Sequence, residues 1–474
     1  MKSKHTNLEQ VTAEEWATCI KVLQLACDDP DAYAVSDMKT LTGLVTKLYK
    51  FSRKQRRQLN EQSHRETQRA LLESSLRCQS EPLDELTMDR ATQTIIQSTA
   101  TYQQSKKFIG CYICKQKYND IHFFYHNLCP SCAEYNYAKR QQRTNLNGRV
   151  AFITGGRIKI GYETVLKLLR DGARVIMTTR FPHDAAHRYA QEADFETWQH
   201  RLKIHGLDLR NIPQVEEFIH HLLNSEPYLD IIINNAAQTV KKPDDFYVHL
   251  MAMETVPIAA LPAKIQALLE TYNHYLPSQP ELTLDKAVLQ LTLPTTPAFP
   301  AGKYDIHGQQ VDLRSDNSWL ATLDNVDTVE LLEVHLVNAL SPFLFNSRLK
   351  PLLLSSPHPK RFIVNVSAME GIFNYRNKTP RHPHTNMAKA ALNMMTRTSA
   401  QDYVKDGIFM NSVDTGWITQ ENPYPIKTRV RQNGFVPPLD IIDGAARVYD
   451  PIVQGNEGAV IYGQFLKDYQ PTNW

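Results

Sequence analysis

The chain has 474 residues, of which 42% are hydrophobic and 22% charged, and its formal net charge at pH 7 is +3. This length and composition are typical of a soluble protein with two to four domains and ample length for a large core. The absence of any uninterrupted apolar run of about 18 residues argues against a membrane-spanning helix. The polar start, residues 1–5, argues against a secretion signal.

Residues 1–105 form the first expected region, which is poor in glycine and helical in pattern. Thr12 followed by Glu15 predicts a capping box at the start of a helix, and Asp28-Asp29-Pro30 predicts its end. A basic run without an intervening acid follows: Lys47, Lys50, Arg53, Lys54, Arg56 and Arg57. Such a run can bind nucleic acid or an acidic partner, but it is more often the solvated face of a helix, and we favour the second interpretation.

Residues 106–140 form a second, small region with four cysteines in two pairs: Cys111, Cys114, Cys129 and Cys132. Each pair has the spacing Cys-x2-Cys, and fourteen residues separate the pairs. Four thiolates satisfy the tetrahedral coordination of Zn²⁺, so this spacing favours a structural zinc site over a redox pair. Because the four cysteines close the site, we expect neither zinc catalysis nor ligation by His122 and His126. The other cysteines are scattered, so the seven together indicate a reducing compartment, the cytoplasm.

Residues 146–474 alternate strand-like and helix-like segments. We expect strands at 150–153, 173–178, 202–207, 229–233, 361–366 and 408–413. This alternation predicts an α/β fold with a doubly wound, Rossmann-like parallel sheet that helices cover on both faces. Between about 238 and 330 the alternation stops and prolines become frequent, apart from a helix-like piece at Ala263–Tyr275. That stretch is interpreted as a long insertion, either a lid or a partner surface.

Arg149–Gly161 has the pattern of an apolar strand, a glycine turn and a helix, which is the layout of a dinucleotide-phosphate cradle. Six further motifs follow in order, and with the turn they resemble the short-chain dehydrogenase/reductase family. The seven motifs are Thr154-Gly155-x3-Lys159-Ile160-Gly161, Asp208 after a strand, Asn234-Asn235-Ala236-Ala237, Asn338, Ser367, Lys389 and Asn411–Ile418.

The resemblance implies a role for each of these residues. A set of residues would surround a nicotinamide dinucleotide: Thr154, Gly155, Lys159, Ile160, Gly161, Arg180, Asp208, Asn235, Ala236, Lys389 and Ile418. Within the reaction centre, Lys389 would hold the nicotinamide ribose and Ser367 the carbonyl oxygen of the substrate. Asn338 would hold a water of the proton relay.

Two cations favour NADP(H) over NAD(H) as the cofactor, because a 2′-phosphate requires positive charge near the adenosine ribose. Lys159 stands where the family usually has glycine and where its pteridine-reductase-like members have arginine, and the resemblance directs it toward that ribose. Arg180 follows the second strand, where NAD-preferring members carry Asp or Glu. The alternative is that both charges face solvent.

The tyrosine that donates the proton in this family lies four residues before the lysine, whose charge lowers the tyrosine pKa. Here that position holds Thr385, and a threonine hydroxyl is too weak an acid at neutral pH. His382 occupies the position, seven residues before the lysine, that the enoyl-reductase branch uses for its tyrosine. His382, His384 and Tyr375 are candidate replacements, since a histidine titrates near neutrality. The alternatives are ordinary loop histidines, a proton from substrate or partner, or a site without hydride transfer.

These observations predict an NADP(H)-dependent oxidoreductase that acts on a carbonyl or hydroxyl group of a small molecule, with an atypical proton donor. The alternative is a catalytically inactive NADP(H)-binding scaffold. Such a scaffold would recruit a protein partner through the N-terminal region, the cysteine-rich region or the insertion. Nucleic acid is a less favoured partner, no membrane association is expected, and homo-oligomers are common in the family.

Overall fold

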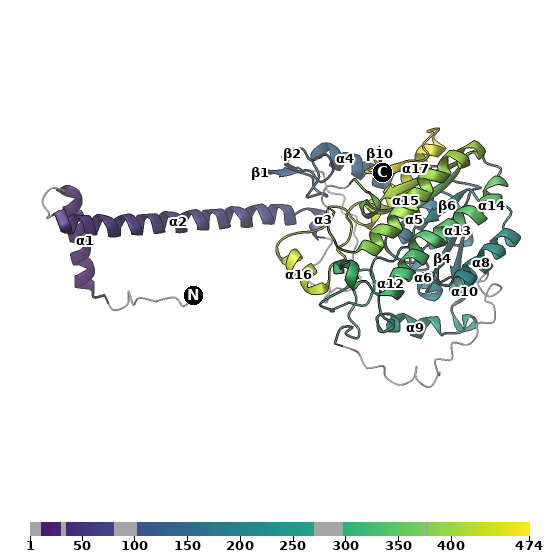
Figure 1. The fold of residues 1–474 in the computed structure, drawn as a ribbon, viewed down its shortest axis with the longest axis horizontal. Coiled ribbons are helices and arrows are strands. Elements are labelled where there is room, and N and C mark those ends of the chain that lie inside the picture. Colours follow the sequence, from purple (N-terminus) through teal and green to yellow (C-terminus); the bar gives the residue numbers. More distant parts are fainter. Residues whose placement is uncertain (1–10, 30–34, 80–101, 270–296, 375–377) are drawn as a thin grey trace. The chain divides into compact units, whose positions relative to one another are not determined.

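The computed structural model of the chain describes residues 11–29, 35–79, 102–269, 297–374 and 378–474 (Figure 1). The chain forms two compact units, Met1–Ala70 and Leu71–Trp474. The three-part division expected from the sequence differs from this, because the cysteine-rich region packs against the sheet domain and belongs to the same unit. Strand β1 also begins within the region expected to be helical.

The first helix, α1 (Ala13–Asp28), has the predicted capping box. Thr12 N donates to Glu15 Oε2 over 2.8 Å, and Glu15 N donates to Thr12 Oγ1 over 3.2 Å. These bonds satisfy backbone N–H groups that the first helical turn leaves without a partner. The helix ends just before Pro30, as expected.

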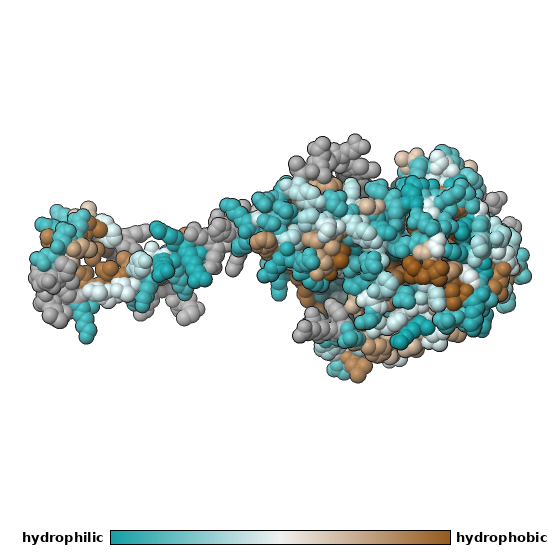
Figure 2. Space-filling model, turned by 90° about the horizontal axis from the view of Figure 1, so that it is seen from above, coloured by the Kyte–Doolittle hydropathy of each residue, from teal (hydrophilic) through white to brown (hydrophobic). Residues whose placement is uncertain are grey.

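The second helix, α2, spans Val35–Glu73, and all six side chains of its basic run are exposed. This exposure agrees with the favoured interpretation of a solvated face. Apolar side chains also lie open on the N-terminal helices (Figure 2). Among them, Trp16 and Leu48 are 55% and 67% exposed.

The cysteine-rich region is an antiparallel ribbon followed by a helix. Its elements are β1 (Gln103–Gly110), β2 (Lys117–Ile121) and α4 (Pro130–Gln141). α4 lies against α17 (Ile441–Asn456), where Arg140 Nη1 contacts Asp440 Oδ1 at 2.6 Å and Lys139 Nζ contacts Asp450 Oδ1 at 2.5 Å. The acidic partners are largely buried, so these ion pairs attach the region firmly to the sheet domain.

The main sheet has the strand order β10-β9-β8-β7-β6-β3-β4-β5, and all neighbours are parallel except β10 and β9. The strands are β3 (Val150–Thr154), β4 (Arg174–Thr179), β5 (Leu202–Gly206), β6 (Ile231–Asn234), β7 (Arg361–Ser367), β8 (Ile408–Asp414), β9 (Phe465–Lys467) and β10 (Gln470–Thr472). The six expected strands are present, with bounds that differ from expectation by two residues at most. The chain winds outward from β3 in both directions, which confirms the predicted doubly wound α/β fold.

Two hydrophobic cores lie on the two faces of the sheet. Ala151 and Ile153 of β3 point into one core, and Val150 and Phe152 point into the other, because side chains alternate along a strand. The helices of the first core are α5 (Lys159–Arg170), α6 (Pro182–Tyr189), α10 (Ala263–Leu269) and α17. Those of the second core are α8 (Ile212–Ser225), α13 (Ser341–Arg348), α14 (Lys350–Leu354) and α15 (Pro383–Tyr403).

The remaining helices are short and lie mostly in connections and in the insertion. They are α3 (Leu76–Gln79), α7 (Phe195–Trp198), α9 (Val248–Glu254), α12 (Thr328–His335) and α16 (Tyr424–Gln432). The 3₁₀ turns are Gln199–Arg201, Asp244–Tyr247, Ile258–Ala260, Ser318–Leu320, Leu323–Asn325, Met369–Gly371 and Val404–Asp406. The helix expected at Ala263–Tyr275 corresponds to α10, and residues 270–275 lie outside the described part of the chain.

Within the described part of the chain, one helical stretch, Thr328–Arg348, is long and apolar enough to cross a membrane, as core helices of soluble domains also can be. It comprises α12, a π-helical turn at Leu336–Leu340, and α13. Its residue Phe345 is fully buried in the second core of the sheet domain.

Candidate active site

A cavity of about 1230 Å³ lies at the carboxyl ends of the parallel strands. Residues just beyond six strands line it: Gly155, Arg180, Asp208, Asn235, Ala368 and Thr415. Ligands of doubly wound folds bind at this edge, because loop side chains and helix N-termini converge there. The insertion contributes Trp319 and His307, and the cysteine-rich region contributes Tyr112. The cavity is therefore lined by residues of the sheet domain, the insertion and the cysteine-rich region.

The turn after β3 is shaped by glycines. Gly155 has a φ of +72°, and a Cβ on Gly161 would lie 2.1 Å from the Gly155 carbonyl oxygen. Thr154 Oγ1 accepts hydrogen bonds from Asn235 N and Ala236 N, each over 3.1 Å, which ties the end of β6 to the turn. The turn leads the N-terminus of α5 to the cavity wall, where backbone N–H groups and the helix dipole favour a phosphate.

Lys159 has the left-handed backbone, with a φ of +55°, that glycine adopts without strain. Burial and the Lys159 ammonium lower the pKa of His307 to about 4. Burial raises the pKa of Glu421, but the charge of Lys159, a hydrogen bond from Thr419 and the charges of two further lysines together hold that pKa below its usual range. The charge of Lys159 thus acts on a residue of the insertion and on one after β8, and Lys159 and Arg180 line the same cavity. Its predicted place at the adenosine ribose stays a prediction.

Arg180 is fixed in the cavity wall just after β4. Its Nη2 donates to Tyr247 OH over 2.8 Å, and its guanidinium lies 4.6 Å from the centre of the Tyr247 ring. Burial raises the pKa of Asp208, but hydrogen bonds from Arg210 and the charge of Arg180 hold it below its usual range. Arg180 therefore lies close to the residue that the resemblance assigns to the adenine.

The opposite part of the predicted site centres on Lys389 of α15. Lys389 is 5% exposed, lines the cavity and donates from Nζ to the Val366 carbonyl oxygen over 2.8 Å. Burial lowers the pKa of Lys389 to about 8, and the carboxylate of Glu370, which also lines the cavity, opposes that shift. The ammonium is therefore mostly charged at pH 7, because its pKa lies only about one unit above that pH.

Ser367 does not take the position that the resemblance implied for it. Its hydroxyl donates to Asn393 Oδ1 over 2.6 Å, and the next residue, Ala368, lines the cavity instead. Asn365 lies on the same face of β7 and likewise bonds to α15, through Thr396 Oγ1. Strand alternation therefore directs Ser367 toward the helix, and a methyl group occupies the place expected for a hydroxyl.

Thr385 lies one helical turn before Lys389 and lines the cavity. It is 1% exposed, and its Oγ1 has no hydrogen-bond partner among the described residues. Buried hydroxyls are almost always satisfied, so this one indicates a position where a bound molecule completes the site.

The two candidate histidines have different surroundings. His382 lines the cavity, stacks on Trp319 with ring centres 3.9 Å apart, and bonds through Nδ1 to the Trp319 carbonyl oxygen. His384 is 1% exposed and lies beside Glu330, with 3.9 Å between Nε2 and Oε1. Burial lowers the pKa of both imidazoles. Tyr375 lies outside the described residues.

Asn338 lies in the π-helical turn between α12 and α13. Its Nδ2 donates to the Gln238 carbonyl oxygen over 2.9 Å, and its Oδ1 accepts from Gln238 N over 2.8 Å. The side chain thus fixes the backbone that follows β6, and the adjacent Val337 is the residue that lines the cavity. The relay role implied for Asn338 stays a prediction.

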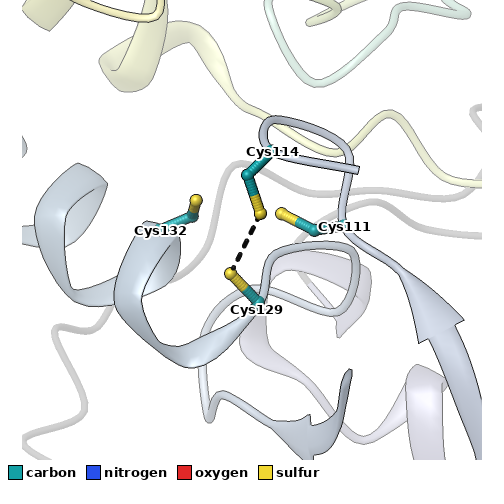
Figure 3. Close-up of side chains that lie close together, drawn as sticks. All are labelled: Cys111, Cys114, Cys129 and Cys132. Carbon is teal, nitrogen blue, oxygen red and sulfur yellow. Dashed lines mark hydrogen bonds between the residues drawn. The ribbon is translucent and has the colours of Figure 1, made fainter. Parts of the chain in front are cut away.

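The four cysteines come together as the spacing predicts. Their sulfur atoms all lie within 4.8 Å of one another, and Cys114 Sγ and Cys129 Sγ are 3.6 Å apart (Figure 3). Four sulfurs at about 2.3 Å from a tetrahedral zinc ion would be about 3.8 Å apart, so the cluster could hold such a metal. Neither His122 nor His126 belongs to the cluster, in agreement with expectation.

The cysteine-rich region also builds part of the cavity, which the sequence did not indicate. Tyr112 and Lys115, in the turn between the first two cysteines, line the cavity. Tyr112 OH accepts a hydrogen bond from Trp417 N over 3.0 Å. Trp417 precedes Ile418, the residue expected beside the nicotinamide, and Ile418 and Ile160 both lie against Gly444 of α17. The cysteine cluster therefore adjoins a wall of the predicted cofactor site.

Comparisons with known proteins identify the family of this chain. The family models described as short chain dehydrogenase and Enoyl-(Acyl carrier protein) reductase match residues 149–256 and 317–433. Uncharacterized protein R665 of Acanthamoeba polyphaga mimivirus is 32% identical over 354 residues, which cover 72% of this chain and 71% of that protein. Human dehydrogenase/reductase SDR family member 13 is 38% identical over 92 residues, 19% of this chain and 24% of that protein. The chain belongs to the short-chain dehydrogenase/reductase family.

Among solved structures, NADPH-bound carbonyl reductase from chicken fatty liver is 17% identical, with a TM-score of 0.42, over 69% of this chain and all of that one. The alignment with the human relative spans about a quarter of that relative's length. Fold and family together place this chain among the NAD(P)-dependent oxidoreductases.

Proposed function

We propose that this chain transfers hydride between NADP(H) and a carbonyl or hydroxyl group of a small molecule. The observation that carries the proposal is one cavity in which the glycine turn, Asp208, Asn235 and Lys389 meet. When bound, the cofactor would supply or accept the hydride. The turn and the N-terminus of α5 would hold its phosphates, Asp208 its adenine, and Lys389 its nicotinamide ribose.

Arg180 supports a preference for NADP(H). Its guanidinium is fixed by Tyr247, and it stands where a carboxylate would bind the 2′-hydroxyl of NAD(H). A preorganised guanidinium binds phosphate through charge-assisted hydrogen bonds and loses little conformational entropy when it does so. Lys159 would act on another part of the ligand, near Glu421 and His307.

The Arg180→Ala variant should bind NADPH about 10- to 100-fold more weakly and NADH nearly as well as the unchanged protein. The reason is that a hydrogen bond to a charged group contributes about 1.5–3 kcal/mol. Fluorescence titrations with both cofactors give the ratio of dissociation constants. Arg397→Ala removes an exposed arginine of α15 and serves as the control. An unchanged ratio in Arg180→Ala would refute the role of Arg180 in cofactor choice.

Turnover is tested by incubating the full chain with NADPH and a panel of aldehydes and ketones while the absorbance of reduced nicotinamide is followed. The expected result is saturable NADPH consumption with at least one carbonyl class. Product analysis should show an equal amount of the corresponding alcohol.

A second candidate function is a cofactor-binding scaffold without catalysis. Ala368 and Thr385 favour it, since neither side chain offers an acidic hydroxyl at the reaction centre. Tight NADPH binding without consumption by any carbonyl or alcohol would support the scaffold and reject the enzyme.

We also propose that the cysteine cluster holds a structural Zn²⁺. The geometry of the four sulfurs supports this, as does the small size of the region, which needs a metal or tight packing to be stable. No position of the cluster is left for a catalytic water if all four thiolates bind.

A further inference from the structure

Reduction of a carbonyl requires one proton for each hydride, and the described residues at the predicted reaction centre offer few groups that could supply it. Ala368 has no proton to give, and the hydroxyl of Ser367 donates its hydrogen to Asn393 Oδ1. Thr385 lines the cavity, but an aliphatic hydroxyl does not ionise near neutral pH. Among the described residues, the candidates for the donor are therefore the titratable groups of the cavity wall.

His382 has the wrong protonation state for a proton donor. Its Nδ1 lies 3.0 Å from a carbonyl oxygen of Trp319, which can only accept, so Nδ1 carries the hydrogen of that bond. Burial lowers the pKa of His382, so the ring is neutral at pH 7 and its Nε2 is unprotonated. A ring in this state accepts a proton and does not donate one.

Lys389 meets the geometric requirements. Its ammonium has three hydrogens, of which one is donated to the Val366 carbonyl oxygen. The side chain is buried yet lines the cavity, next to the unpartnered Thr385 hydroxyl one helical turn earlier. We propose that Lys389 itself is the general acid of carbonyl reduction, with Thr385 holding the substrate oxygen. This inference rests on the proposed function.

The step balances as follows. The carbonyl carbon gains hydride from the reduced nicotinamide, and the C=O π electrons move to oxygen. The oxygen takes a proton from Lys389 Nζ, so an N–H bond breaks and an O–H bond forms. Lys389 is left as a neutral amine and regains a proton from water, while the nicotinamide is left oxidised.

The electrostatic surroundings of Lys389 suit this role. Charged and titratable groups on the neighbouring elements are Glu370 after β7, Lys378 and His382 before α15, and Asp414 at the end of β8. Asp414 is paired with Lys467 at 2.9 Å, and Glu370 is the group whose charge acts on Lys389. Burial brings the pKa of Lys389 to about 8, so the amine is mostly protonated at pH 7 and gives up its proton readily.

The Lys389→Arg variant separates acid catalysis from ribose binding. Arginine keeps a cation for the ribose but stays protonated throughout the accessible pH range. We expect kcat to fall by about 100-fold or more, the usual contribution of a general acid, while the dissociation constant of NADPH changes by less than about tenfold. Adding Thr385→Tyr to Lys389→Arg places an acid beside the cation and should recover much of the loss. Lys405→Arg, an exposed lysine after α15, is the matched control.

The pH dependence gives an independent readout. Since the protonated amine is the active form, kcat should be constant below pH 8 and fall above it. Glu370→Gln removes the charge that raises the pKa of Lys389. The fall in kcat should therefore begin at a lower pH in this variant. In cofactor-free protein labelled with ¹⁵N-lysine, the resonance that disappears in Lys389→Arg should titrate near pH 8.

The outcomes distinguish the inference from the function on which it rests. Absence of NADPH binding or of any turnover in the unchanged protein would reject the proposed function. Turnover in the unchanged protein that persists in Lys389→Arg, with the same pH limb, would reject Lys389 as the acid and leave the function standing. A titration of Lys389 near pH 10 would also count against its acid role.

Discussion

If the cysteine cluster holds zinc as proposed, the Cys129→Ser variant should lose the metal and, with it, most of its affinity for NADPH. Zinc binding supplies about 10–16 kcal/mol of folding free energy in small zinc domains, and three thiolates and a hydroxyl bind the ion far more weakly. The turn between Cys111 and Cys114 carries Tyr112, whose hydroxyl holds the backbone at Trp417. Release of the metal would free this wall of the cavity. We expect zinc content to fall to background and the NADPH dissociation constant to rise by about tenfold or more.

Metal analysis of the purified variant and a fluorescence titration with NADPH measure the two effects. Cys27→Ser is the matched control, because Cys27 is an exposed cysteine of α1 outside the cluster. If Cys129→Ser lost its zinc but bound NADPH as tightly as the control, the cysteine-rich region would have no part in the cofactor site.

The Gly161→Ala variant should be unable to form the phosphate cradle. The new Cβ would lie 2.1 Å from the Gly155 carbonyl oxygen and 2.5 Å from Asn235 Nδ2. The oxygen belongs to the backbone of the turn itself, so relief requires moving the turn away from α5. Overpacking of this kind costs about 1–3 kcal/mol of stability, and displacement of the cradle adds a loss of NADPH affinity that we expect to exceed tenfold.

Chemical denaturation and NADPH titration of the same preparation give both quantities. Gly43→Ala provides the comparison, since a Cβ at Gly43 meets no atom within 4 Å and alanine favours the helix in which it lies. Equal NADPH affinity in Gly161→Ala and the unchanged chain would show that the turn does not bind the cofactor.

Much of the sheet could be predicted because each parallel strand is a short apolar run that ends at a turn. Val150–Thr154 and Ile408–Asp414 are buried along their whole length, as strands covered on both faces must be. The cysteine cluster was equally predictable, because two knuckles of fixed spacing carry their own geometry. In both cases the information is local in the sequence.

The positions of single side chains at the site were less predictable. Ser367 and Ala368 are neighbours, and the resemblance selected the serine although the alternation along β7 places it on the same face as Asn365. That alternation was available in the sequence and would have pointed to Ala368. The place of Lys159 beside the ribose stays a prediction, and its charge also acts on the insertion residue His307 and on Glu421, which are distant in sequence and could not be linked to it from the sequence alone.

The attachment of the cysteine-rich region to the cavity had no signal in the sequence. It depends on contacts between residues some 300 positions apart, such as Tyr112 with Trp417 and Arg140 with Asp440. Each of these residue types is common on surfaces, so a single sequence does not distinguish a buried pair from two solvated side chains.

The central claim is that the glycine turn, Arg180 and Lys389 together form an NADP(H) site. An equilibrium titration of the purified full chain with NADPH and with NADH, followed by cofactor fluorescence, tests it most directly. We predict saturable binding of one NADPH per chain and clearly weaker binding of NADH. Absence of saturable binding of either cofactor, in protein with its metal in place, would contradict the account.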